Sequence, residues 1–216
     1  MPRRLQAISI AGPAGRLEAV LQEREGAPAA VAALVCHPHP LHGGTMHNKV
    51  VHRVASTLHD LGAAALRFNF RGAGGSEGHH DRGDGEVEDA RAALRWLAGR
   101  HSGARLWVAG FSFGAWIAAR LAASEPGVER LILVAPPVGR SSFEALRRSR
   151  VPKTVFQGGR DDICPPQEIE RELPTWMDPK QLVMVPEATH FFDRQLGALG
   201  EALISALGGL VANAAG

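Results

Sequence analysis

The chain has 216 residues, 45% hydrophobic and 21% charged, and its 24 Lys and Arg exceed its 22 Asp and Glu by a formal charge of +2. These values are typical of one globular domain, spanning 1–216, and give no case for a nucleic-acid or anionic-membrane partner. The N-terminal stretch has no apolar core before Gly12 and Pro13, and no apolar run looks long enough to span a bilayer. We therefore expect a cytoplasmic protein without a membrane partner.

Strand-like and helix-like segments alternate along the chain. The expected strands cover 5–11, 16–23, 29–36, 63–70, 105–109, 128–135, 151–157 and 181–185. The expected helices cover 47–61, 84–99, 113–124, 165–173 and a closing segment over 192–210, with Asp84 as an N-cap. The first two strands should form an antiparallel hairpin, whereas the continuous apolar run of 29–36 is typical of a strand buried on both faces. The pattern predicts an α/β domain with a mostly parallel sheet, whose chemistry lies at the carboxyl ends of its strands.

The central motif is Gly110-Phe111-Ser112-Phe113-Gly114, which lies between an apolar strand and a helix. This is the pattern of a nucleophile elbow, in which the serine occupies a strained turn and the glycines leave room for it. The helix that begins behind the serine offers amide donors to a developing oxyanion. Ser112 is therefore the candidate nucleophile.

A serine nucleophile needs a base, and the base needs a group that holds its tautomer. His190 is the only histidine after Ser112, and it follows the last expected strand. Two carboxylates, Asp161 and Asp162, follow the preceding strand. Either could be the acid, and the order Ser, Asp, His is that of α/β hydrolases.

Several motifs together resemble the α/β-hydrolase superfamily, and within it small bacterial hydrolases without a large cap that are related to dienelactone hydrolase. The motifs are His37-Pro38-His39-Pro40, 43–51, 68–76, the Ser112 elbow, Gly158-x-x-Asp161 and His190-Phe191-Phe192. The resemblance implies a central sheet of about eight strands, with Ser112 as nucleophile, Asp161 as acid and His190 as base. Dienelactone hydrolase itself uses a cysteine nucleophile, so its substrate does not carry over to this serine-containing chain.

An oxyanion hole requires two backbone amides. One should belong to Phe113, directly after the nucleophile. The second should come from the loop that begins at His37, in which the prolines have no N–H to give. The relatives' pattern points to His39, with Leu41 as second choice.

Other residues invite different interpretations. The histidines of the 37–47 segment match no zinc spacing, so we expect a proline-stiffened loop and no metal. His79 and His80 should be solvated, and the Gly-rich segment 71–76 lacks the lysine of a phosphate loop and should be a structural turn. The usual strand order would place Cys36 and Cys164 about 14 Å apart, beyond the reach of a disulfide, so we expect free thiols.

Only residues 136–150 separate two strands where larger relatives carry a lid, so the site should be open and shallow. Apolar side chains should line it: Leu41, Met46, Phe113, Phe143, Phe191 and Phe192. The leading hypothesis is a serine carboxylesterase for small or short-acyl esters that needs no cofactor, with a homodimer left open. A thioesterase, lactonase or peptidase with the same triad, and a catalytically silent binding protein, are the alternatives.

Overall fold

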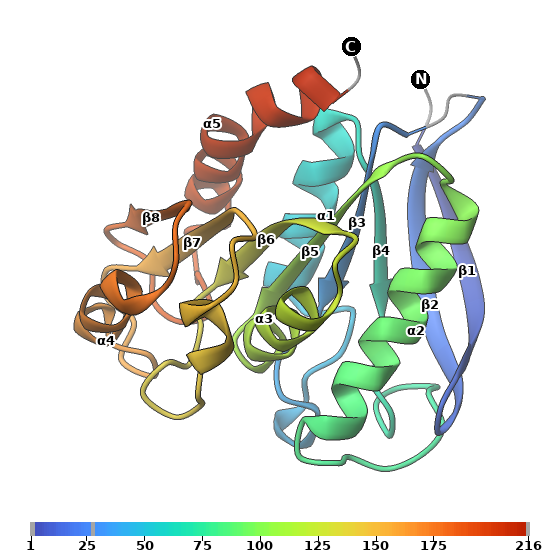
Figure 1. Cartoon of the computed structure of the whole chain (residues 1–216), viewed down its shortest axis with the longest axis horizontal. Helices are drawn as coiled ribbons and strands as arrows, with labels where there is room; N and C mark the ends of the chain where they lie inside the picture. Colours follow the sequence, from blue (N-terminus) through green and yellow to red (C-terminus); the bar gives the residue numbers. More distant parts are fainter. Residues whose placement is uncertain (1–2, 27–28, 215–216) are drawn as a thin grey trace.

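The computed structural model describes residues 3–26 and 29–214, which build one eight-stranded sheet in the order β1-β2-β4-β3-β5-β6-β7-β8 (Figure 1). β1 and β2 are antiparallel, β2 pairs antiparallel with β4, and the pairs from β4 to β8 are parallel. The strands are β1 (Arg3–Gly12), β2 (Gly15–Arg24), β3 (Val31–Cys36), β4 (Ala64–Phe68), β5 (Arg105–Phe111), β6 (Val128–Val134), β7 (Lys153–Gly158) and β8 (Lys180–Val185). The expected mostly parallel sheet of about eight strands is confirmed.

Helices cover both faces of the sheet, and each face has its own hydrophobic cluster. Figure 1 shows α2 and α3 in front of the sheet, where they bury Leu94 and Ile117 against the cluster that includes Leu66 and Val108. α1 and α5 belong to the cluster on the other face. The helices are α1 (Lys49–Leu61), α2 (Asp84–Arg100), α3 (Phe113–Ser124), α4 (Pro166–Glu172) and α5 (Leu196–Ala214), with short 3₁₀ turns η1 (Pro40–His42), η2 (Glu144–Arg147) and η3 (Leu173–Thr175).

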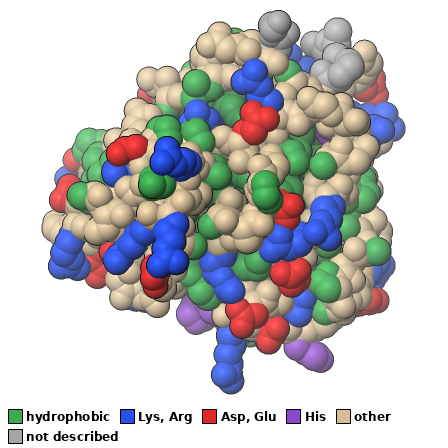
Figure 2. Space-filling model, in the orientation of Figure 1, with side chains coloured by type: hydrophobic (Ala, Val, Ile, Leu, Met, Phe, Trp, Pro, Cys, Tyr) green, Lys and Arg blue, Asp and Glu red, His purple; other side chains and the backbone are tan. Residues whose placement is uncertain are grey.

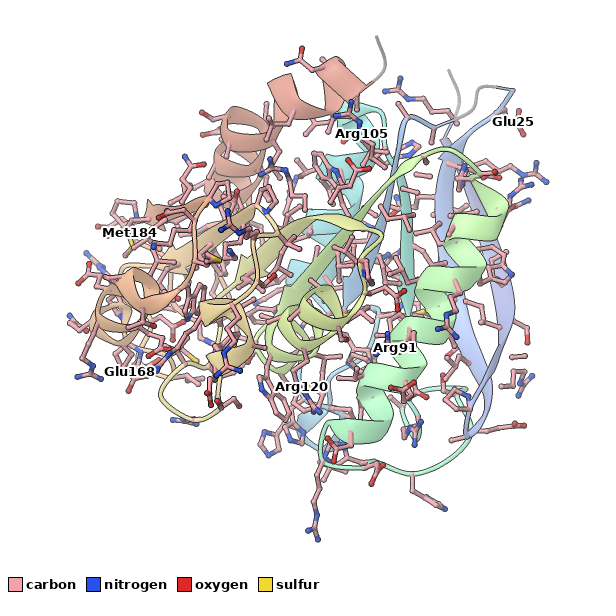
Figure 3. The ribbon with its side chains drawn as sticks, viewed as in Figure 1. Glu25, Arg91, Arg105, Arg120, Glu168 and Met184 are labelled. Atoms are coloured by element: carbon pink, nitrogen blue, oxygen red, sulfur yellow. The ribbon has the colours of Figure 1, made fainter. Side chains whose placement is uncertain are left out.

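Ion pairs also connect the two front helices. Arg120 of α3 lies 2.7 Å from Asp84 at the start of α2, and Arg91 of α2 pairs with Glu125 just after α3. Figure 3 labels the two arginines on these neighbouring helices. On the molecular face drawn in Figure 2, basic and acidic side chains are interspersed and neither sign dominates. That distribution agrees with the small formal charge of the chain.

The starts of α2 and α5 differ from expectation. Asp84 is the first residue of α2 and not its N-cap, which is Gly83; the Glu86 carboxylate accepts the Gly83 amide at 2.7 Å and so replaces the missing cap side chain. Phe192 lies before α5, because Phe192 and Arg194 have φ values of 52° and 60°, outside the helical region. The closing helix therefore begins only at Leu196.

Helix α5 corrects the expectation that no apolar run could span a bilayer. It has 19 residues, and its most apolar part has a mean hydropathy of 1.4, so by length and composition alone it is able to span a bilayer. In the structure 28% of that part is buried in the protein. One face packs in the core through Leu199, Leu203, Leu207 and Val211.

No large cap covers the carboxyl ends of the strands in the part of the chain that the structure describes. The connection from β6 to β7 contains only the four-residue turn η2, as the short segment predicts. Cys36 ends β3 and Cys164 follows β7, which lies three places away in the sheet, and both thiols are free as expected.

Candidate active site

Ser112 lies in a strained turn between β5 and α3. Its φ of 53° and ψ of −120° are unusual for a residue with a side chain. A Cβ on Gly110 would lie 2.1 Å from the carbonyl oxygen of Gly114, so a side chain cannot fit there. The Ser112 amide donates to Val134 of β6 at 2.9 Å, which fixes the turn to the neighbouring strand.

Gly114 allows the loop after β3 to approach the first turn of α3. A Cβ on this glycine would lie 2.4 Å from the carbonyl oxygen of Cys36 and 2.5 Å from that of His37. Only glycine permits such a contact between two backbones. The contact brings the 37–41 loop and the Phe113 amide to the same end of the sheet.

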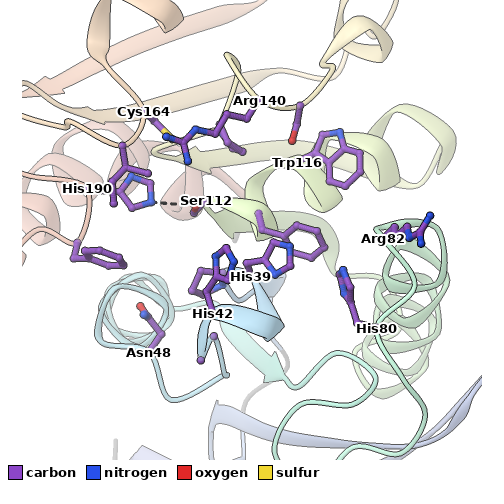
Figure 4. A pocket seen from close by; sticks show the side chains of 18 residues that line it. His39, His42, Asn48, His80, Arg82, Ser112, Trp116, Arg140, Cys164 and His190 are labelled. Carbon is purple, nitrogen blue, oxygen red and sulfur yellow. Dashed lines mark hydrogen bonds between the residues drawn. The ribbon is translucent and has the colours of Figure 1, made fainter.

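Three side chains distant in sequence form one hydrogen-bonded row. The Ser112 hydroxyl Oγ lies 3.0 Å from His190 Nε2 (Figure 4). On the other side of the ring, His190 Nδ1 lies 2.8 Å from Asp161 Oδ2. Asp161 and His190 are both 3% exposed, whereas Asp162 is exposed. The structure thus places Asp161, and not Asp162, behind the imidazole.

The Asp161 carboxylate is held by more than the histidine. Its Oδ1 accepts the amides of Ile163 at 3.0 Å and Cys164 at 2.7 Å, while its Oδ2 also accepts Nε2 of Gln157 at 3.0 Å. Gln157 is fully buried on β7 and donates as well to the carbonyl of Cys164 at 2.8 Å. Sequence reasoning missed this residue, although a glutamine inside a buried strand was the available signal.

Backbone proximity and aromatic rings position His190. A Cβ on Gly158, the last residue of β7, would lie 2.5 Å from the carbonyl oxygen of Ala188, so this glycine lets the acid and histidine loops meet. The imidazole centroid lies 5.2 Å from the ring of Phe111 and 5.1 Å from that of Phe191. The imidazole therefore packs beside two phenyl rings while each of its nitrogens has a hydrogen-bond partner.

The amides of Phe113 and His39 are the candidate oxyanion donors. Within residues 3–26 and 29–214, no hydrogen bond engages either of them. The Leu41 amide instead donates to Nδ1 of His39 at 3.3 Å. Because the Leu41 amide already has a partner, whereas the His39 amide has none among the described residues, the geometry favours His39 over Leu41.

His37 secures the loop that carries His39. Its imidazole is fully buried, its Nδ1–H donates to the carbonyl of Pro38 at 2.7 Å, and its Nε2 accepts the Phe70 amide at 3.0 Å. Burial lowers the pKa of His37 to about 4, so the ring is neutral at pH 7 and can use one nitrogen as an acceptor.

A cavity of about 470 Å³ opens beside Ser112. Phe113 and Phe191 line it as predicted, but the other four apolar side chains of the expected lining do not. Met46, Phe143 and Phe192 are buried in the protein interior, with Phe143 stacked on Trp176, and Leu41 is 69% exposed to solvent. These assignments are corrected: hydrophobicity marks core positions as readily as pocket positions.

Imidazoles form much of the cavity wall instead. His39 stacks on His42 with ring centroids 4.6 Å apart and lies 4.9 Å from His80, and all three line the cavity (Figure 4). Burial, followed by these two neighbours, lowers the pKa of His39. The expectation that His80 is solvated is wrong, since its Nδ1 lies 2.7 Å from the buried Glu86 carboxylate. His79 is exposed, as expected.

The Gly-rich segment 71–76 serves the fold. Arg71 binds the fully buried Asp89 through Nε at 2.9 Å and Nη2 at 2.8 Å. The Gly75 amide donates to Glu18 of β2 at 2.7 Å. These contacts fasten the turn to α2 and to the sheet, as a structural turn requires.

Comparison with known proteins also indicates a serine hydrolase. The sequence model of the family described as serine aminopeptidase, S33, matches residues 33–148. A protein of Rickettsia prowazekii is 42% identical over 163 residues, which cover 74% of this chain and 68% of the relative.

Solved structures extend the likeness to almost the whole chain. An α/β serine hydrolase homologue from Coxiella burnetii is 42% identical with a TM-score of 0.89, and the match covers 94% of this chain and 97% of that one. A serine hydrolase without a lid from Xanthomonas campestris is 40% identical with a TM-score of 0.88, covering 96% and 95%. A dienelactone hydrolase from Anabaena variabilis, 21% identical with a TM-score of 0.82 and coverage of 96% and 98%, shares the fold.

Proposed function

The chain belongs to the serine aminopeptidase S33 family of α/β serine hydrolases, and on that premise we propose that it is a carboxylesterase acting on small or short-acyl esters. The observation that carries the proposal is the continuous row from Ser112 Oγ through His190 to Asp161, with contacts of 3.0 and 2.8 Å. A hydroxyl within reach of an imidazole whose other nitrogen is held by a buried carboxylate is the arrangement that activates serine.

The reaction follows from these contacts. His190 Nε2 accepts the Ser112 proton as Oγ attacks the ester carbonyl, and Asp161 stabilises the imidazolium through Nδ1–H. The Phe113 and His39 amides donate to the oxyanion. His190 then protonates the leaving alcohol, and the same nitrogen activates a water molecule that hydrolyses the acyl-enzyme. The steps use only the chain's own groups and water.

The cavity favours an ester over an N-terminal peptide substrate. An aminopeptidase must hold the free ammonium group of its substrate, which calls for a carboxylate near the reacting carbonyl. None of the described residues that line the cavity is Asp or Glu, whereas Arg82 and Arg140 both line it. We therefore propose ester cleavage, even though the family description names a peptidase.

The missing lid supports a preference for short acyl chains. Each methylene contributes about 0.8 kcal/mol of binding only when it is removed from water. The cavity has a volume of about 470 Å³. The described part of the protein has no cap that would bury the remainder of a long acyl group. Hydrolysis of p-nitrophenyl esters should fall from acetate or butyrate to palmitate, measured at matched detergent concentration. A preference for palmitate would refute the short-acyl proposal.

A serine-directed fluorophosphonate probe separates an enzyme from a binding protein. The wild type should be labelled, and Ser112→Ala should not. The same substitution should lower kcat for p-nitrophenyl butyrate by about 10⁶-fold, as expected when the nucleophile of a triad is lost. If the wild type stays unlabelled while control hydrolases react, the chain is a silent binding protein on this fold.

A further inference from the structure

We propose that Asp161, Cys164 and His190 together form an inhibitory binding site for a thiophilic divalent cation such as Zn²⁺. One ligand atom from each residue lies within 4.8 Å of the other two, and all three residues are buried. Thiolate, imidazole and carboxylate are the three ligand types that zinc takes in proteins. Among the described residues, this group is the one in which three such side chains converge so closely.

The separations are close to those of a bound ion. Zinc bonds of about 2.0–2.3 Å in tetrahedral geometry place the ligand atoms about 3.5 Å apart. Ligand atoms within 4.8 Å of one another therefore need their separations to change by about 1.3 Å or less. Cys164 follows Asp161 in the same tight turn, where its amide donates to Oδ1 of that carboxylate at 2.7 Å, so two of the ligands are held on one rigid segment.

The ion can reach the site through the substrate cavity. Cys164 and His190 both line that cavity, and Figure 4 shows Cys164 on the side of His190 that faces away from the His39, His42 and His80 wall. The nearby guanidinium of Arg140, which also lines the cavity, opposes a cation there. We therefore expect micromolar rather than tighter binding, on the order of 10⁻⁶ M.

A cation bound at this site would block catalysis because it changes the tautomer of His190. This inhibition depends on the proposed function, whereas binding of the cation does not. In the resting row, Nδ1 carries the proton and Nε2 is free to accept one from Ser112. An ion between Asp161 and His190 takes Nδ1 as its ligand, so the ring proton moves to Nε2. The Cys164 thiol loses its proton to solvent. An Nε2 that already carries a proton cannot act as base for Ser112.

Binding is tested without turnover in the Ser112→Ala protein. Co²⁺ added to this protein should produce the near-ultraviolet thiolate charge-transfer band, and Zn²⁺ should displace it. The band should vanish in Ser112→Ala with Cys164→Ser. It should persist with Cys36→Ser, the matched control, because Cys36 lies on β3 outside the cluster. In calorimetry, the Cys164→Ser change should weaken Zn²⁺ binding by about 100-fold.

Inhibition is tested in chains that retain Ser112. Zn²⁺ should inhibit hydrolysis of p-nitrophenyl butyrate, EDTA should reverse it, and Cys164→Ser should raise the half-inhibiting concentration by about 100-fold relative to its own uninhibited rate. Equal inhibition of the Cys164→Ser protein, or relief by His42→Ala instead, would assign the ion to the imidazole wall and overturn the proposal. Absent fluorophosphonate labelling in metal-free wild type would refute the esterase alone, since the cobalt band does not depend on it.

Discussion

The buried neutral imidazole of His37 should make the free energy of unfolding depend on pH, and a substitution at this residue can isolate its contribution. Its pKa is about 4 in the folded protein, because burial disfavours the charged ring, against 6.5 when exposed. As the pH falls below 6.5, the unfolded chain binds a proton at this position that the folded chain does not bind. His37 therefore contributes full stability above pH 6.5 and loses it progressively as the pH falls towards 4.

The two pKa values set the magnitude. Linkage gives a loss of about 2 kcal/mol at pH 5 and about 3 kcal/mol at pH 4, relative to neutral pH. His37→Gln removes the titration and keeps a side chain that can both donate and accept a hydrogen bond. At pH 7 the variant should be less stable by about 1–3 kcal/mol, because its amide fits the contacts to Pro38 and Phe70 less well.

The measurement is urea unfolding followed by tryptophan fluorescence at several pH values for both proteins. The free-energy difference between wild type and His37→Gln should shrink by about 2 kcal/mol between pH 7 and pH 5. Burial also lowers the pKa of His39 and His101, but both proteins contain these residues, so their own contributions largely cancel in the difference. The charge interaction of His39 with His37 is the smallest cause of the lowered His37 pKa, and burial is the largest. A difference that stays constant over this range would show that His37 titrates like an exposed histidine, and the reasoning would fail.

Two further substitutions test the construction of the site. Gly114→Ala should lower kcat about 10²–10³-fold, because the new methyl group pushes the carbonyls of Cys36 and His37 away from α3 and so separates the two oxyanion amides. Gly197→Ala is the control: the space around its Cβ position is open, so kcat should be unchanged. Equal rates in the two variants would contradict this. Gln157→Leu should cost about 1.5–3 kcal/mol of stability in denaturant and lower kcat/KM at least about 10-fold, because Asp161 and the Cys164 carbonyl both lose a donor; unchanged kinetics would make Gln157 purely structural.

Local motifs predict the sheet and the catalytic row well, because each motif fixes its own backbone. The elbow around Ser112 is specified by two glycines with different duties, one clearing the turn and one admitting the His37 loop. Gly158 does the same for the loop before His190. The positions of all these glycines are visible in the sequence, and so are the strand ends that carry the chemistry.

The cavity wall could not be predicted in the same way, since it depends on packing between segments far apart in sequence. Phe192 is hydrophobic and adjacent to Phe191, yet a positive φ turns it into the core while Phe191 stays at the cavity. His80 lies beside His39 and next to the Glu86 carboxylate, which belongs to a different segment of the chain. Neither outcome follows from residue type or spacing.

The position of Cys164 depends both on a local turn and on the packing of distant segments around the candidate active site. An aspartate that accepts the amides two and three residues later forms a common local turn, and Asp161 does so with Ile163 and Cys164. The turn that holds the carboxylate for His190 therefore also holds a thiol beside it. A cation that prefers sulfur should therefore find its ligand set inside the catalytic row, and not at the more numerous histidines of the cavity wall.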